Sequence, residues 1–282
     1  GVLRTLNGAT VENKGWELAM GYTDNLDNGL TYTISTNFGA FKDKITALPE
    51  EVRTGFAGNA EQDILGQSQF AIFGFSANGL FQNQAEVDAH ATQVGAAPGR
   101  IRYVDLNNDG VVNALDQEFF GTTLPSLEYG LSINLGYRNF DLSLFGSGVA
   151  GRRGFDNYIF LNEFIRGREN VGPGTLDAWT PQNTGSTIPA LTLSDGNNET
   201  RASNYLFVNN SYFKLRNFSL GYSLSERILN NLGPVSAFRM YVQVENLFWI
   251  KSNEFKGPDP ERTNMSAIPV PTVLSLGLNV SL

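Results

Sequence analysis

The chain contains no cysteine, a single histidine and no long apolar run among its 282 residues. Without cysteine, disulfide and thiol chemistry are excluded, but secreted and outer-membrane proteins also lack disulfides, so the redox compartment stays open. No run of about 18 apolar residues occurs, so we expect no membrane-spanning helix. Because transmembrane strands are only half apolar, this absence says nothing against a β-barrel.

Catalytic motifs are missing too. Only one histidine, His90, is available to a nucleophile–base pair, and no Gly-x-Ser-x-Gly turn stands between a strand and a helix. No glycine-rich phosphate loop precedes a helix. We expect His90 to be a solvated loop residue and the protein not to be an enzyme; a hydrolase is the least favoured interpretation.

Positive charge is scarce, since the formal net charge is −8, and nucleic acid is therefore not an expected partner. Aromatic residues make up 12% of the chain, with 20 Phe, 10 Tyr and 30 Gly. With few helical patterns, this composition favours an all-β protein. The sequence starts at Gly1 without Met or a signal-peptide pattern, and we interpret it as a piece of a longer polypeptide.

The segment Thr272–Leu282 shows the pattern that organises the chain. Apolar residues alternate strictly with small or polar ones, which places the two sets on opposite faces of a strand. The apolar set is Leu274, Leu276, Leu278, Val280 and Leu282. A soluble sandwich strand shows this pattern as well, but segments of about ten residues, apolar outward and polar inward, are typical of transmembrane barrels.

The same alternation recurs upstream and predicts seven strands. They are Gly15–Thr23, Leu30–Phe38, Ser126–Arg138, Phe140–Phe145, Ser211–Ser223, Ala237–Glu245 and Thr272–Leu282. The segment Gln69–Phe75 is a weaker candidate that either lies within a loop or pairs with an unrecognised strand. Ser225 is expected to cap a short helix through Leu232. Arg239 and Glu245 fall on inward positions, which is ordinary only where the lumen is water-filled.

Long and short connections alternate, which assigns the two ends of the predicted barrel. The short turns Asp24–Gly29, Arg138–Asn139 and 224–236 are expected on the periplasmic side, and the stretches 42–125, 147–204 and 250–271 outside. Aromatic residues near strand ends fit an interfacial girdle, although they are also simple β-formers. These residues are Trp16, Tyr22, Tyr137, Tyr222 and Trp249.

A calcium-type loop at residues 105–116 is the sharpest local motif. Oxygen ligands occupy positions one, three, five, nine and twelve, a backbone carbonyl position seven, and glycine position six, as in an EF-hand. The expected ligands are Asp105, Asn107, Asp109, the Val111 carbonyl, Asn113 and Asp116. Position twelve is Asp rather than Glu, a variant similar to dockerin loops, and Val112 is expected to pack behind the loop. We expect a structural Ca²⁺; the alternative is an Asn/Asp-rich turn without an ion.

Arginines and aromatic residues cluster in the long stretch 147–204. The cluster contains Arg152, Arg153, Arg166, Arg168, Phe155, Tyr158, Phe160 and Phe164. It fits a surface for sugars or acidic peptides, or a contact between loops or with a partner. We favour the contact, because interface cores are enriched in aromatic residues and arginine.

Several sequence stretches together resemble the C-terminal barrel region of SusC-like TonB-dependent transporters of Bacteroidota. They occur in family order over nearly the whole chain. They are Asn13-Lys-Gly-Trp-Glu17, Gly79-Leu-Phe-Gln82, Pro98-Gly99 with Tyr103 to Gly110, Trp179-Thr-Pro-Gln-Asn183, Asn210 to Asn217 with Leu220-Gly-Tyr222, Asn246-Leu-Phe248 and Gly257-Pro-Asp-Pro-Glu261.

The resemblance implies an all-β fold: residues 1–282 would form the C-terminal portion of an antiparallel transmembrane β-barrel of about 22 strands, with long extracellular loops. Nothing in the sequence matches the family's plug domain or N-terminal regions. The resemblance also implies a cell outer-membrane location among outer-membrane lipid, a SusD-like surface lipoprotein as lid, and energy from TonB-ExbB-ExbD. It implies oligosaccharide or peptide substrates.

An alternative of another class is a secreted, calcium-stabilised β-rich binding module that docks a partner through its dockerin-like loop. Dockerin modules normally carry two such loops with flanking helices, and one is present in this sequence. Solubility without detergent would favour the module.

Overall fold

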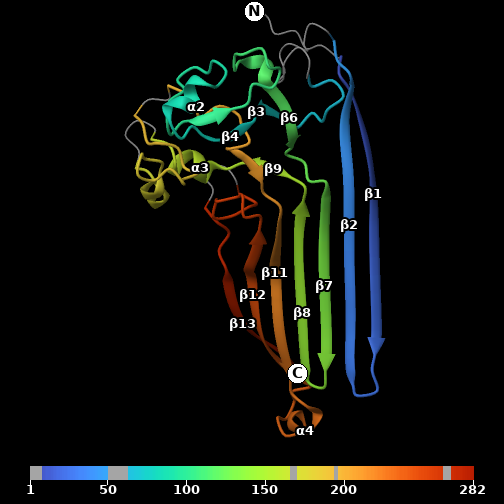
Figure 1. Cartoon of the computed structure of the whole chain (residues 1–282). Helices are drawn as coiled ribbons and strands as arrows, with labels where there is room; N and C mark the ends of the chain where they lie inside the picture. Colours follow the sequence, from blue (N-terminus) through green and yellow to red (C-terminus); the bar gives the residue numbers. More distant parts are fainter. Residues whose placement is uncertain (1–7, 50–62, 166–169, 194–195, 263–267) are drawn as a thin grey trace, which may run out of the picture.

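A computed structural model describes residues 8–49, 63–165, 170–193, 196–262 and 268–282. Its main element is an antiparallel sheet of seven strands in the order β1-β2-β7-β8-β11-β12-β13 (Figure 1). The bounds are β1 Thr10–Asn25, β2 Leu30–Ala47, β7 Leu127–Tyr137, β8 Phe140–Ala150, β11 Tyr212–Ser223, β12 Ala237–Lys251 and β13 Val273–Ser281. The seven strands predicted from the alternation are these seven.

The cross-strand register aligns apolar residues into continuous rows. One row crosses the sheet through Tyr22, Ile34, Ile133, Leu144, Phe218, Val244 and Leu274. The adjacent row, one residue along each strand and on the opposite face, is Thr23, Thr33, Asn134, Ser143, Ser219, Gln243 and Ser275. The sheet therefore has one dry face and one polar face across its full width.

The dry face is not covered by other parts of the described chain. Leu274 is 67% exposed, Leu276 82% and Met240 42%, and Phe218 is half-buried. An uncovered apolar face of this extent needs an apolar environment, which a lipid bilayer provides for barrel strands. The strands β1 and β13 form the two edges, so the described sheet is an arc of a barrel wall rather than a closed barrel.

The connections divide between the two ends of the sheet as predicted. One end carries short turns and the small helix α4 (Glu226–Leu229), and all long connections gather at the other (Figure 1). We call the first the short-turn end and the second the long-loop end. No helix within the described ranges is long and apolar enough to cross a membrane.

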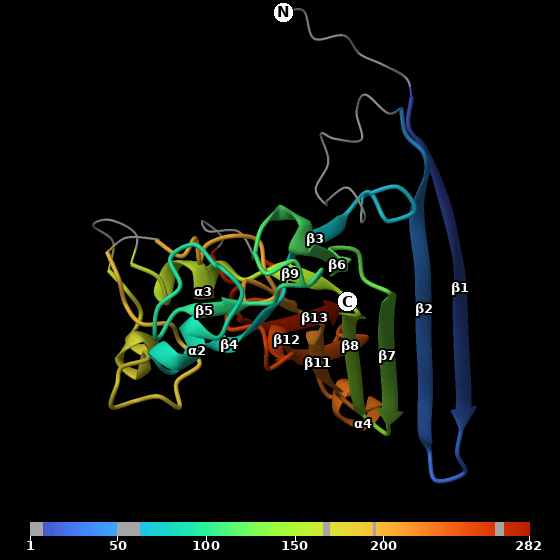
Figure 2. The same cartoon turned by 45° about the horizontal axis from the view of Figure 1, so that its top comes forward.

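The long connections fold into an ordered assembly, which we call the outer unit (Figure 2). Its elements are β3 Ala71–Phe75, β4 Ala77–Leu80, α2 Gln84–Asp88, β5 Ile101–Tyr103, η1 Ala114–Asp116, β6 Gln117–Thr122, β9 Arg153–Phe155, α3 Asn157–Asn162, η2 Pro173–Asp177 and β10 Phe207–Asn209. Three two-stranded sheets form within it: β3 with β6, β4 with β5, and β9 with β10. The weaker strand candidate Gln69–Phe75 thus lies inside the insertion, where β3 pairs with β6, a strand that was not predicted from the sequence.

Several strands are longer at the long-loop end than the sequence predicted. β2 continues to Ala47, β8 to Ala150 and β12 to Lys251. The alternation is lost there because the polar face becomes covered: Ile45 is buried against Ile64 and Phe73 of the outer unit. One girdle assignment is wrong. Trp249 pairs with Lys214 on the inner face, and the Lys214 ammonium group lies over its ring, 5.6 Å from the ring centre. Trp249 therefore does not face lipid.

Candidate functional site

The outer unit has its own hydrophobic core, formed from segments far apart in sequence. Residues from 75 to 112, from 159 to 179 and from 206 to 255 meet in it: Phe75, Leu80, Ile101, Tyr103, Val112, Ile159, Phe164, Trp179, Leu206, Val208 and Phe255. The sequence predicted no trusted strand in 147–204, because the residues that stabilise this segment lie outside it. A packed unit, rather than free loops, therefore stands over the long-loop end of the wall.

A buried polar network joins two segments of this unit. The Gln93 amide donates to the Ile101 carbonyl and to Asn197 Oδ1, both at 2.8 Å, and accepts from the Tyr103 amide at 2.9 Å. Glu199 accepts from Arg100 Nη1 at 2.8 Å and from the Ile101 amide at 2.9 Å. Because each buried donor and acceptor is paired, the network fixes one arrangement of the two segments.

Asp156 connects the outer unit to the loop after β12. Its Oδ1 accepts from the Tyr158 amide at 2.9 Å and caps α3. Its Oδ2 accepts from the backbone amides of Lys256 and Gly257. The side chain is fully buried, so these hydrogen bonds replace its lost hydration.

A second anchor lies where the inner face of the wall meets the same loop. Lys214 is fully buried, and its ammonium group lies 3.0 Å from Glu261 and 3.8 Å from Asp259. Burial alone would raise the pKa of Glu261, but hydrogen bonds from Arg216, Tyr212 and Lys214 outweigh it and lower that pKa to about 2. The Glu261 carboxylate is thus held ionised over the end of β11. We call Lys214, Asp259, Glu261 and Arg216 the ionic anchor.

The predicted calcium loop forms a compact turn whose oxygens accept backbone hydrogen bonds. Asp105 accepts from the amides of Asp109 at 3.2 Å and Gly110 at 2.9 Å. Gly110 has φ +85°, which only glycine adopts without strain. Val112 is buried behind the loop in the core of the outer unit, as expected.

The side chains expected to hold the ion differ in exposure. Asn107 and Asp109 are exposed, whereas Asp116 is buried and accepts from the amides of Leu106 and Asn113 at 2.8 and 2.7 Å. Asn113 caps η1 and donates to the Val111 carbonyl at 3.2 Å. Among the described residues no three His, Cys, Asp or Glu side chains are gathered as in a metal site. The donor set consists of hard oxygens, which suits Ca²⁺ in kind.

The other sequence candidates have structural contacts. Arg152 donates to Asn210 Oδ1 at 2.9 Å and to the Pro260 carbonyl at 2.8 Å, and Arg153 donates to the Phe207 carbonyl at 3.0 Å. The favoured contact between loops is therefore what these two arginines make; Arg166 and Arg168 lie outside the described residues. His90 is half-buried rather than solvated, with Nε2 2.9 Å from the Tyr103 carbonyl oxygen.

An open pocket of about 360 Å³ lies in the outer unit and has no charged residue in its lining. Polar contributors include Gln82, Ser186, Asn204 and Tyr205. The Tyr205 hydroxyl donates to Glu163 Oε2 at 2.6 Å, and burial, then the nearby Glu163 carboxylate, raises the pKa of Tyr205 far above its usual value. Tyr205 therefore stays neutral, and the pocket suits an uncharged polar group.

Together, the dry outer face, the polar inner face and the packed unit at one end define the wall of a transmembrane β-barrel. Solved structures share this fold. The chain matches "Structure of the RagAB peptide transporter" with TM-score 0.70 and 18% identity, covering 94% of this chain and 28% of that one. It matches the RagAB peptide importer in the "closed-closed" state with TM-score 0.73 and 16% identity, covering 97% and 30%.

Curated relatives carry the name TonB-dependent receptor. The chain is 28% identical to TonB-dependent receptor P3 of Formosa agariphila over 90% of its length and 26% of the relative. It is 25% identical to TonB-dependent receptor SusC of Bacteroides thetaiotaomicron over 99% of its length and 27% of the relative. No protein-family model matches. The resemblance to SusC-like TonB-dependent transporters is thus confirmed, and the chain spans about a quarter of the length of these relatives. These relatives are receptors rather than enzymes, as expected.

Proposed function

We propose that this chain supplies part of the wall and the outer unit of an outer-membrane TonB-dependent importer. The observation that carries the proposal is the uncovered dry face, which runs as continuous rows across all seven strands. The names of the relatives support it over the secreted binding module. Placement as the C-terminal portion of a barrel of about 22 strands rests on the sequence resemblance.

Two adjacent residues near the middle of β13 give a matched test of this orientation. Leu276 lies on the dry face and Ser275 on the polar face. In the full-length receptor, Leu276→Arg would place a charge in the hydrocarbon and cost about 2–4 kcal/mol. Ser275→Arg would place the same charge in the lumen and be tolerated. The measurement is the fraction of receptor in the heat-modifiable, folded form in outer membranes. Equal loss in both variants, or in neither, would refute the assigned faces.

The names of the relatives support a proposal about the cargo and the partners. RagAB is described as a peptide importer, and SusC is a TonB-dependent receptor. We propose import of oligosaccharides or peptides, a SusD-like lipoprotein over the outer unit, and energy supplied through TonB-ExbB-ExbD. Affinity purification of the full-length receptor from its native membrane tests the lid. A surface lipoprotein should be recovered in equimolar amount, and recovery of the receptor alone would contradict this part of the proposal.

We also propose that residues 105–116 bind Ca²⁺ as a structural ion. Asp105, Asn107, Asp109, the Val111 carbonyl, Asn113 and Asp116 supply the oxygens, which brings two negative charges together at the exposed side of the loop and a third behind it. Even a weak site, with a Kd of about 10⁻⁴ to 10⁻³ M, fills at extracellular calcium concentrations.

Calorimetry of the receptor with and without chelator tests the ion. We expect heat of Ca²⁺ binding that is lost in Asp105→Asn/Asp109→Asn and retained in Asp88→Asn/Glu226→Gln, which removes two carboxylate charges on α2 and α4. No heat for the unmodified receptor would remove the calcium assignment without affecting the importer assignment.

A further inference from the structure

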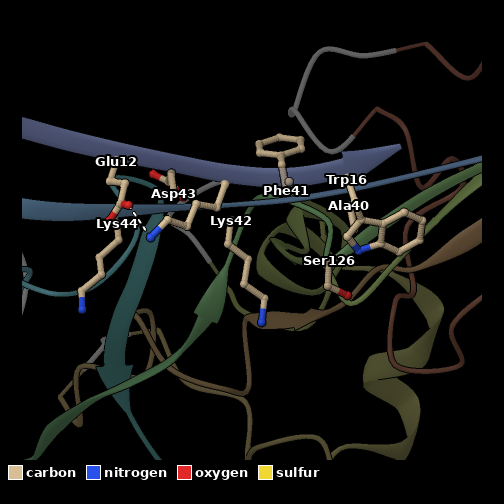
Figure 3. A pocket seen from close by; sticks show the side chains of 10 residues that line it. Glu12, Trp16, Ala40, Phe41, Lys42, Asp43, Lys44 and Ser126 are labelled. Atoms are coloured by element: carbon tan, nitrogen blue, oxygen red, sulfur yellow. Dashed lines mark ion pairs between the residues drawn. The ribbon is translucent and has the colours of Figure 1, made fainter. Parts of the chain in front are cut away.

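An open pocket of about 540 Å³ lies at the long-loop end of β1 and β2. Its lining includes three lysines, Lys14, Lys42 and Lys44, together with Trp16 and Glu12 (Figure 3). The chain as a whole is acidic, with 20 basic and 28 acidic residues, so three lysines in one pocket are a local reversal of charge. We call Lys14, Lys42 and Lys44 the lysine patch.

The strand register puts the lysine patch on the outside of the wall. Lys14 lies opposite Lys42, and two residues along, Trp16 lies opposite Ala40 and Leu18 opposite Phe38. The face that carries the dry rows therefore continues directly into the patch. Figure 3 shows the side chains of Lys42 and Lys44 projecting to the opposite side of β2 from Phe41.

The depth of the patch matches the headgroup region of a bilayer. Trp16 is 54% exposed on the dry face. Because indole rings prefer the membrane interface, Trp16 marks the level of that interface on β1. Lys14 is two residues further toward the long-loop end, about 7 Å at the usual rise of a strand. A lysine at this level extends its ammonium group into the headgroups while its methylene chain stays against the apolar face.

The arrangement of charges calls for an anion. Two lysines placed directly opposite each other on paired strands destabilise the sheet unless their charges are neutralised. Glu12 forms an ion pair with Lys14. Asp43, the other acidic residue in the lining, is buried and accepts from the Gln69 amide at 2.8 Å on the inner side. Among the described residues on the outer side, Glu12, which also lies opposite Lys44, is the one carboxylate beside the three lysines, so two positive charges remain in excess.

We propose that the lysine patch binds the phosphate of an anionic lipid headgroup in the leaflet at the long-loop end. This inference rests on the proposed function, since it needs the dry face to lie in a bilayer. The register places the three lysines on the dry-face side of the wall, so a headgroup bound by them has its acyl chains alongside the dry face. Trp16 borders the site and packs against the apolar part of the bound lipid.

The test uses the full-length receptor in nanodiscs of phosphatidylcholine with a minor fraction of phosphatidic acid, and native mass spectrometry to count retained lipid. Lys42→Gln/Lys44→Gln is expected to lower phosphatidic acid retention at least about tenfold, because each removed charge weakens attraction to anionic lipid. The matched control Arg227→Gln/Lys256→Gln removes two charges elsewhere and should retain lipid as the unmodified receptor does. Inorganic phosphate at millimolar concentration should not displace the lipid.

The outcomes separate this proposal from the importer assignment. Equal phosphatidic acid retention by the patch variant and the unmodified receptor, in properly inserted receptor, would refute the lysine patch alone. Displacement by inorganic phosphate would also refute it, because the site would then recognise the free anion rather than a lipid. Failure of the unmodified receptor to insert in a bilayer would instead overturn the proposed function.

Discussion

Lys214 offers the most informative single perturbation, because its charge is fully buried and depends on one loop for compensation. Its ammonium group lies 3.0 Å from Glu261 and 3.8 Å from Asp259, and no atom of its side chain is exposed. Replacement of Glu261 by Gln leaves that buried charge with only the more distant carboxylate. We expect this change to open the loop around 252–262.

The magnitude follows from the cost of an uncompensated buried charge. Removing one partner of a buried pair costs about 3–5 kcal/mol. Glu261 is 21% exposed and Asp259 remains close to Lys214, so we expect about 2–3 kcal/mol, at or just below the lower limit of that range after allowance for solvent. Lys214→Met removes the charge itself, and the double variant removes both members.

Hydrogen exchange of the full-length receptor in detergent measures the effect. Glu261→Gln should raise exchange in segments 208–216 and 256–262, whereas Glu226→Gln, an exposed carboxylate on α4, should leave it unchanged. In Lys214→Met/Glu261→Gln much of the protection should return, since the buried ammonium group is gone and Asp259 keeps its hydrogen bonds from the amides of Glu261 and Val270. Unchanged exchange in Glu261→Gln, or a double variant worse than both single ones, would refute the anchor.

Three further predictions concern the outer unit and its attachment. The pKa of Glu261 is lowered from 4.5 to about 2. The stabilisation from its ionised form is therefore complete above about pH 4.5 and is lost as the pH falls toward 2. Protection of the loop from hydrogen exchange should fall over that pH window in the unmodified receptor and stay constant in Glu261→Gln. Gly95 has φ +73°, and an added Cβ would lie 2.0 Å from the Gly196 carbonyl oxygen. Gly95→Ala should therefore destabilise the outer unit by at least about 1–3 kcal/mol from backbone strain alone, measured as faster proteolysis. Gly185 has open space around it, so Gly185→Ala should leave the rate of proteolysis unchanged. Ser203 is fully buried and its Oγ has no hydrogen-bond partner among the described residues; Ser203→Ala should keep or raise thermal stability by up to about 1 kcal/mol, and a clear loss would mean that the hydroxyl has a partner.

The wall could be predicted from the sequence because its information is local. Each strand carries its own alternation, and rows such as Ile133 with Leu144 need only neighbouring strands to form. Strand ends were less accurate where the inner face becomes covered, as at Ile45, since burial on both faces removes the alternation. Trp249 was misassigned for a related reason. The register shift in β11 between Leu215 and Asn217, as it pairs with β12, is not visible in either strand alone.

The outer unit could not be predicted in this way, because its stabilising contacts join segments about a hundred residues apart. Gln93 contacts Asn197, and Asp156 contacts the amide of Lys256. No periodicity marks such pairs. The calcium-type loop was visible because its residues are consecutive, and the buried position of Val112 followed from the motif; the capping role of Asn113 and the burial of Asp116 appear only in the structure.

Within the described residues, the wall has no core of its own and the outer unit has one, so the two parts of this chain are stabilised in different solvents, lipid and water. The hydrophobic effect stabilises the outer unit by burying Phe81, Tyr103 and Leu206 away from water. The wall gains little from the hydrophobic effect and depends on backbone hydrogen bonds between its strands in lipid. Chaotropes and cooling weaken the first force more than the second. Unfolding should therefore proceed in two stages, with the outer unit melting while the barrel strands persist, and a single melting temperature would describe neither part.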